Sequence, residues 1–136
     1  MVDEVQFSSF NHPRLANLRR LHPERLQDGS HRYKTGALFN SNTPFDFLDR
    51  AKEIGASEIH LKYNECTKAR VESAHTQGYR VMAWFCGPIT MKQNATMNNE
   101  GNEDEAMYEK VIASGCDEMC VNRVYLLAEM KRKANK

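Results

Sequence analysis

The chain lacks long apolar runs, an excess of charge of either sign and a leader-like beginning. Its longest uninterrupted apolar run, residues 81–86, is far short of the roughly 20 residues that cross a bilayer. The formal net charge is only +1, which excludes strong long-range attraction to nucleic acid or to an anionic membrane surface. Residues 1–5 have neither the basic nor the apolar region of a signal peptide. We therefore expect a cytoplasmic protein with no membrane span and no nucleic-acid partner.

The four cysteines form no recognisable framework. Cys116 and Cys120 have a spacing that suits half of a zinc site, but no second pair of Cys or His follows to complete it. Cys86 and Cys120 fall within expected strands, where a free cysteine behaves as a small hydrophobe. We interpret all four cysteines as reduced thiols in the core of a cytosolic protein.

What the chain does contain is one repeated unit, a short apolar strand followed by an amphipathic helix, which occurs five times in residues 6–130. Alternation of this kind is typical of an α/β fold, a parallel sheet with right-handed crossovers. A chain of 136 residues makes one domain at most. The expected strands are residues 5–10, 35–40, 58–63, 79–85 and 118–121. The helices that follow them are expected to begin near residues 11, 43, 67, 105 and 125.

The ends of the expected helices carry local signals. Asn11 caps the first helix, and Pro13 is tolerated in its first turn. Thr43 followed by proline predicts the start of the second helix. The buried stripe of that helix is expected at Phe45, Leu48, Ala51 and Ile54. Three later turns share one pattern, in which a glycine ends the helix in the left-handed conformation: Gly55, Gly78 and Gly115.

Functional sites of such folds lie at the carboxyl ends of the strands, and here those ends are poor in acid–base groups. They carry no carboxylate cluster for a divalent cation and no glycine-rich phosphate loop. His60 lies within a strand, where a packed or hydrogen-bonded histidine is the common case. His12 and His22 flank prolines near helix ends, where we expect solvated roles. The acidic residues 103–105 begin a helix, where negative charge suits the dipole.

Trp84 is the exception among the strand-end residues. It is the only tryptophan, and it lies near the end of the most apolar strand. A tryptophan at this place stacks on a ligand or floors a pocket, and the alternative role is that of a core aromatic. The polar residues 94–105 lengthen the link after this strand, on the functional side of the fold. We interpret this link as a surface insertion of about residues 87–104.

Four phrases, in order, are similar to those of a known family. The opening Gln6-Phe7-Ser8-Ser9-Phe10 resembles the mid-barrel strand of the glycerophosphodiester phosphodiesterases, and residues 36–39 resemble that family's next strand. Residues 59–84 are similar to the run that leads into the family's WTvN motif, and residues 115–123 resemble its final GvDgiiTDrP motif. The order and spacing agree over residues 6–127, which is nearly the whole chain.

The resemblance implies that residues 1–136 are the C-terminal part of that family's domain. The implied fold is a partial TIM (β/α)8 barrel of about five parallel βα units, corresponding to strands 4–8. The implied activity is hydrolysis of a glycerophosphodiester to glycerol 3-phosphate and an alcohol, a reaction of lipid metabolism. In the family, the catalytic histidines and the ligands of a divalent metal, Mg²⁺ or Ca²⁺, lie on strands one to three. We therefore expect no catalytic residue, no metal ligand and no turnover from this chain alone.

Of the family's functional positions, Trp84 carries over best, as a wall of the glycerophosphodiester pocket. The Thr and Asn of the WTvN motif are replaced here by Phe85 and Gly87. The Asp and Pro of the final motif are replaced by Asn122 and Val124. These departures argue against the family's usual substrate contacts at those four positions.

A five-strand segment of a barrel exposes two strand edges, which invite pairing with another chain. We therefore expect the chain to be completed by the missing N-terminal half of the barrel or by self-association. One alternative is a complete five-stranded flavodoxin-like module with a binding or regulatory role. That module would need a ligand site at a reversal of strand order, and the sequence offers no phosphate loop or anionic cluster for one. Another alternative is a non-catalytic partner that docks on a full-length phosphodiesterase.

Overall fold

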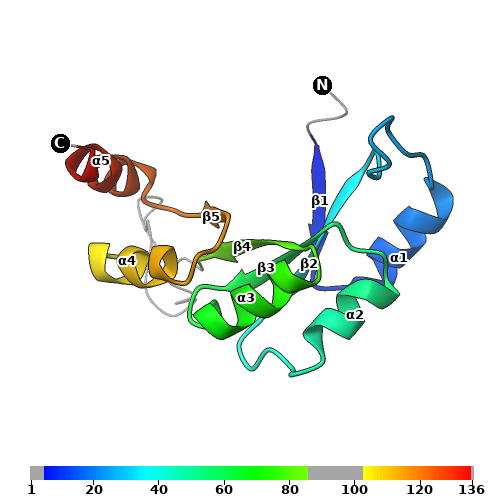
Figure 1. Cartoon of the computed structure of the whole chain (residues 1–136), viewed down its shortest axis with the longest axis horizontal. Coiled ribbons are helices and arrows are strands. Elements are labelled where there is room, and N and C mark those ends of the chain that lie inside the picture. The colour runs from blue at the N-terminus through cyan, green and yellow to red at the C-terminus, as the bar shows by residue number, and fades with distance from the viewer. Residues whose placement is uncertain (1–4, 86–102, 136) are drawn as a thin grey trace, which may run out of the picture.

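The computed structural model describes residues 5–85 and 103–135. Within these ranges, five strands alternate with five helices and build one curled sheet (Figure 1). The strands are β1 (Gln6–Ser9), β2 (Lys34–Phe39), β3 (Glu58–Lys62), β4 (Arg80–Trp84) and β5 (Glu118–Cys120). The helices are α1 (His12–Leu21), α2 (Phe47–Glu53), α3 (Lys68–Thr76), α4 (Glu105–Ala113) and α5 (Val124–Ala134).

The strands are hydrogen-bonded in their order along the chain, from β1 to β5, and each neighbouring pair is parallel. This is the winding of a (β/α)8 barrel, in which each unit lies beside the one before it. A flavodoxin-like module has the strand order 2-1-3-4-5 instead, with a reversal inside the sheet. The described strands therefore have the topology of a barrel segment and not that of the flavodoxin-like alternative.

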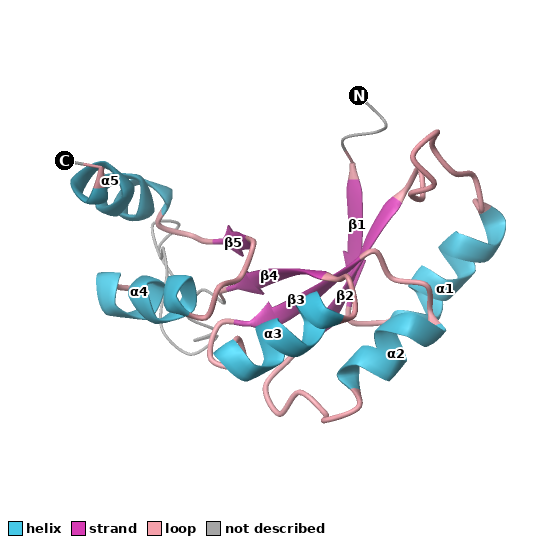
Figure 2. Cartoon of the chain, viewed as in Figure 1, coloured by secondary structure: helices cyan, strands magenta, loops and turns pink. Residues whose placement is uncertain are grey.

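The outer face of the sheet carries the hydrophobic core. Helices α1 to α4 follow one another along this outer side of the curve, and the described residues place no helix on the inner side (Figure 2). The strand residues of the core are Ala37, Phe39, Ile59, Leu61, Val81 and Ala83. The helix residues that pack with them include Phe47, Ala51, Val71, Ala74, Tyr108 and Val111. Full burial of each large apolar side chain contributes about 1.5–3 kcal/mol.

Successive residues of a strand point to opposite faces of the sheet. The residues that alternate with the core positions therefore point to the inner face, and several of them are polar or charged. Glu58 and His60 of β3 lie here and are only 6% and 1% exposed. The His60 ring covers Gly36 of β2, so closely that a Cβ atom on Gly36 would lie 2.1 Å from His60 Cε1. His60 Nε2 is 3.4 Å from Glu58 Oε2, and Arg80 Nε is 3.8 Å from Glu58 Oε1. The prediction of a packed, hydrogen-bonded His60 is confirmed.

Most helix ends follow the local signals in the sequence. The Asn11 side chain caps α1 by accepting a hydrogen bond from the backbone amide of Arg14 at 3.4 Å. Gly55, Gly78 and Gly115 have φ angles of 63°, 83° and 82°, which is the left-handed conformation expected where a helix ends. These positions also fix where the next strand begins, and the strand boundaries agree with the prediction to within one residue.

The start of α2 is where the prediction is wrong. The Thr43 hydroxyl donates to the Asn40 carbonyl oxygen at 3.1 Å, and the Thr43 amide donates to Glu65 Oε2 at 3.2 Å. With these bonds the chain forms a turn before the helix, which begins only at Phe47. Phe45 is consequently 98% exposed. The core position expected for Phe45 is occupied by Phe47, which is only 4% exposed.

The two strands at the ends of the described sheet, β1 and β5, each have one unpaired edge. Among the described strands, β1 pairs only with β2, and β5 pairs only with β4. Apolar side chains near these edges are exposed, among them Phe7 (41%) and Phe10 (54%) at β1 and Val124 (66%) after β5. Edges of this kind are open to pairing with further strands.

The three described cysteines are free. Cys66 is buried and Cys116 half-buried, whereas Cys120 is exposed. The expectation of a buried Cys120 is wrong, because it lies in the edge strand β5 and faces the open inner side. Cys86 and residues 87–102 of the expected insertion lie outside the described residues. None of the helices in the described ranges has the length and apolarity that a membrane crossing needs.

Candidate functional site at the carboxyl end of the sheet

The carboxyl ends of β3 and β4 bring Lys62 and Trp84 together on the inner face, where the two residues are register partners. Lys62 Nζ lies 6.0 Å from the centroid of the indole ring, within reach of a cation–π interaction. Nζ also donates a hydrogen bond of 2.8 Å to Oγ of Ser41, in the loop after β2. A positioned cation therefore lies over the aromatic ring at this end of the sheet.

Two contacts fix the orientation of the Trp84 indole. Its Nε1–H donates to the backbone carbonyl oxygen of Phe39 at 3.1 Å. Phe10, just after β1, meets the ring edge to face, with 5.4 Å between centroids and 77° between planes. Trp84 is half-buried and Phe10 is 54% exposed, so aromatic surface remains open to a ligand. We call Phe10, Ser41, Lys62 and Trp84 the Trp84 site.

Sequence reasoning placed Phe10, Lys62 and Trp84 at strand ends but singled out Trp84 alone. In the structure Lys62 and Trp84 are each the fifth residue of their strands, and neighbouring parallel strands of equal length bring such residues together. The expected strands, residues 58–63 and 79–85, place Lys62 fifth and Trp84 sixth and so do not align them. Ser41 carried no signal either, because it lies in a loop whose path depends on distant contacts.

Other strand-end residues belong to the core between sheet and helices. Phe39, Leu61 and Phe85 are buried there, as alternation along the strands requires. Tyr63 stacks on Phe85, with 5.0 Å between ring centroids and 9° between planes. These residues support the Trp84 site from behind and do not line the inner face.

Glu103 is a buried anchor at the carboxyl end of β5. Its side chain is 1% exposed and accepts hydrogen bonds from the Tyr108 hydroxyl and from the Asn122 amide, the latter at 3.0 Å. Arg123 Nη1 donates to the Glu103 carbonyl oxygen at 2.7 Å. The pKa of Tyr108 is raised, mainly by burial and secondly by its hydrogen bond to Glu103. The acidic residues 103–105 lie at the start of α4, as the sequence indicated, and Asp104 caps that helix. Glu103, directly before the cap, is in addition buried.

Glu65, just after β3, is a second carboxylate that is held in place by internal partners. Its Oε2 lies 2.6 Å from Arg70 Nη1, and the carboxylate accepts hydrogen bonds from the amides of Asn42 and Thr43 at 3.3 and 3.2 Å. Burial opposes the charge on Glu65, but the Asn42 amide and the Arg70 guanidinium outweigh it, and the pKa of the carboxyl lies below its ordinary value. Glu65 and Glu103 are thus both held by internal partners.

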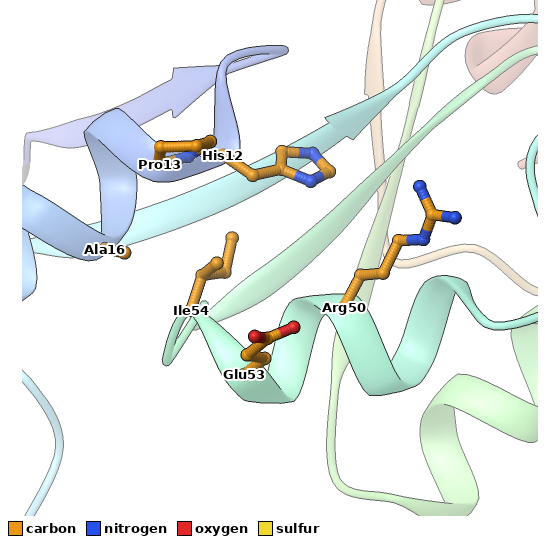
Figure 3. Close-up of a pocket in the computed structure, with 6 residues that line it drawn as sticks. All are labelled: His12, Pro13, Ala16, Arg50, Glu53 and Ile54. Carbon is orange, nitrogen blue, oxygen red and sulfur yellow. The ribbon is translucent and has the colours of Figure 1, made fainter.

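His12 lies on the helix side of the sheet, away from the Trp84 site. Its Nε2 is 2.9 Å from the Leu38 carbonyl oxygen, and its ring meets Phe39 edge to face. The expectation of a solvated His12 is therefore wrong. The ring borders a cavity of about 510 Å³ between α1 and α2 (Figure 3). The other residues that line this cavity are Pro13, Ala16, Arg50, Glu53 and Ile54, and they offer no Ser, Thr or Cys nucleophile.

The described residues do not fit a divalent metal ion. They contain no group of three or more His, Cys, Asp or Glu side chains that would hold one. Sites for Mg²⁺ or Ca²⁺ are built from oxygen ligands, usually including free carboxylates. Glu65 and Glu103, beside the strand ends, already have internal partners. We assign no step of a reaction to a metal on this chain.

Comparison with family models and with curated proteins finds no match, whereas solved structures do match. A protein from Galdieria sulphuraria with the provisional name glycerophosphodiester phosphodiesterase aligns with 96% of this chain, at 26% identity and a TM-score of 0.76. A phosphodiesterase from Oleispira antarctica, solved in complex with the product sn-glycerol-3-phosphate, aligns with 86%, at 20% identity and a TM-score of 0.61. Both of these structural neighbours are thus named as phosphodiesterases, and the Galdieria protein is named as a glycerophosphodiester phosphodiesterase.

The resemblance to glycerophosphodiester phosphodiesterases seen in the sequence is thereby confirmed, and so is the partial TIM barrel. At 20% identity the likeness to the Oleispira protein shows the fold alone. The chain spans less than half of these structures, 44% of the Galdieria protein and 37% of the Oleispira protein. What the described residues provide is one wall of such a barrel, with the Trp84 site at its carboxyl end.

Proposed function

We propose that residues 1–136 are the C-terminal part of a glycerophosphodiester phosphodiesterase domain. The completed barrel hydrolyses a glycerophosphodiester to glycerol 3-phosphate and an alcohol. The observation that carries this proposal is the TM-score of 0.76 over 96% of the chain. The sequential parallel order of the strands supports it. This chain contributes binding surface and has no turnover alone.

The Trp84 site supports a binding role in this reaction. It lies at the carboxyl ends of the strands, where the sites of this fold are found. The half-buried indole of Trp84 is held by its bond to the Phe39 carbonyl and by Phe10. A flat aromatic surface fixed in this way serves as a wall for the apolar parts of a substrate.

The number of strands indicates what completes the barrel. Eight strands close a TIM barrel, and the described sheet has five, so three more are needed. A second copy of this chain brings five strands and does not make a barrel of eight. The missing N-terminal half is therefore the better partner for the open edges of β1 and β5. By the resemblance, that half also carries the catalytic histidines and the metal ligands.

A complementation assay tests the proposal. A three-unit N-terminal half-barrel from an active glycerophosphodiester phosphodiesterase is mixed with this chain in Mg²⁺ or Ca²⁺, and release of glycerol 3-phosphate is measured. We expect turnover in the mixture and none from either half alone. The melting temperature of this chain should rise with the concentration of the half-barrel, because a partner that binds only the native state stabilises it.

The Trp84→Ala variant tests the contribution of the indole, and it should lower turnover of the mixture while leaving assembly intact. Turnover by this chain alone would refute the proposal that its catalytic groups lie elsewhere. A stable complex without turnover would instead favour the role of a non-catalytic partner. The open strand edges of the described sheet are compatible with docking of that kind.

A further inference from the structure

The Trp84 site contains a cation where a cationic ligand would otherwise bind. Quaternary ammonium groups are recognised by aromatic faces, and tryptophan is the strongest partner. Over the Trp84 ring, Lys62 Nζ already lies at 6.0 Å. The bond from Nζ to Ser41 Oγ, 2.8 Å long, holds the ammonium group in this place.

The charge of Lys62 has no carboxylate partner among the described residues. Its hydrogen bond goes to the uncharged hydroxyl of Ser41. Glu65 is bonded to Arg70 and to two backbone amides. Glu103 is bonded to Tyr108 and to backbone amides after β5. A ligand that reaches the Trp84 ring therefore meets the positive charge of Lys62.

We propose that Lys62 makes the Trp84 site select against glycerophosphodiesters whose alcohol is cationic. The inference rests on the proposed function, because it concerns the head group of the same substrate. An ammonium group such as that of choline is repelled by Lys62 and finds the indole face taken. An uncharged alcohol such as glycerol meets neither obstacle. Like charges about 6 Å apart change affinity by about threefold in bulk water and by about a hundredfold at the effective dielectric of a protein surface, and for this half-buried site we expect about tenfold.

The single tryptophan provides a specific probe, because only Trp84 gives an indole N–H signal in the NMR spectrum. That signal is titrated in the 136-residue chain with glycerophosphoglycerol and with glycerophosphocholine, which share their glycerophosphate part. We expect the choline compound to bind about tenfold more weakly. Lys62→Gln should bring the two affinities to within about twofold, and Lys62→Glu should reverse the preference.

Lys34→Gln is the matched control variant. Lys34 begins β2, at the amino end of the sheet, and its side chain is exposed. The substitution removes the same charge as Lys62→Gln but at the opposite end of the strands. It is expected to keep the tenfold preference. Loss of the preference in Lys34→Gln would overturn the inference, since net charge and not the position of Lys62 would then set it.

The titration of the unmodified chain with the two probes tests the inference even if a variant fails to fold. Equal affinity for the two probes would overturn this inference and leave the proposed function in place. An indole signal that responds to neither probe would overturn this inference and the binding role of the Trp84 site, whereas the hydrolytic function of the completed barrel is tested by the complementation assay. Weaker binding of the choline compound, lost on Lys62→Gln, is the expected result.

Discussion

Replacing Gly36 by alanine tests how closely β2 and β3 approach on the inner face. The added Cβ atom would lie 2.1, 2.3 and 2.5 Å from Cε1, Nε2 and Nδ1 of the His60 ring. Carbon atoms in good contact are about 3.5–4.0 Å apart. The ring has little room to move, because His60 is 1% exposed and its Nε2 lies 3.4 Å from Glu58 Oε2.

We expect Gly36→Ala to lower the free energy of unfolding by about 1–3 kcal/mol, the usual range for an overpacked interior. Alanine also has less backbone entropy to lose than glycine, which offsets about 0.5–1 kcal/mol of this loss. The net loss should therefore be about 0.5–2 kcal/mol. Urea unfolding followed by circular dichroism measures it, provided that the transition is two-state.

The same substitution in a His60→Ala background separates the clash from other effects. Without the ring, Gly36→Ala should be neutral or should stabilise the chain by up to about 1 kcal/mol. The two backgrounds form a double-mutant cycle, in which the coupling reports the contact between position 36 and the ring. An equal loss in both backgrounds would refute the claim that His60 requires glycine at this position.

Two further predictions concern buried and ionised carboxylates. Glu103→Ala leaves the Tyr108 hydroxyl without its acceptor and should lower the free energy of unfolding in urea by about 1–3 kcal/mol. The exposed Glu109→Ala control should change it by less than about 0.5 kcal/mol; equal effects would contradict the anchoring role. Asp117 accepts a 2.7 Å hydrogen bond from the Val81 amide, and although burial opposes its charge, its hydrogen bonds hold the pKa below the ordinary value. Because this folded-state pKa is depressed, Asp117 stabilises the chain above the unfolded-state pKa, and that contribution is lost as pH falls through the folded-state value. The urea midpoint of Asp117→Asn should therefore fall less on acidification than that of the unmodified chain, and an unchanged pH profile would contradict this.

The repeat was predictable because its signals are local. A glycine such as Gly55 ends a helix and fixes the start of the next strand within a few residues. The start of α2 was not predictable, although Thr43 and the proline after it look like a helix start. The Thr43 amide is bonded to Glu65, 22 residues away in the chain, and a local pattern does not contain that contact.

Within the candidate site, only a residue whose place follows from its position in a strand was predictable from the sequence. Trp84 stood out as the single tryptophan near the end of an apolar strand. The cation over its ring depends on the register of β3 with β4 and on a loop that brings Ser41 to Lys62. The burial of Glu103 likewise depends on Tyr108 of α4 and on Asn122 after β5, which both donate hydrogen bonds to its carboxylate. Neither arrangement follows from the residues next to these positions in the sequence.

Binding without hydrolysis at the Trp84 site is the central claim, and one NMR sample tests it most directly. The purified chain is incubated with glycerophosphoglycerol and Mg²⁺ or Ca²⁺. The indole signal of Trp84 reports binding, and the phosphorus spectrum distinguishes the diester from glycerol 3-phosphate. We predict a saturable shift of the indole signal while the diester persists. Release of glycerol 3-phosphate by the chain, or an indole signal that does not respond, would contradict the claim.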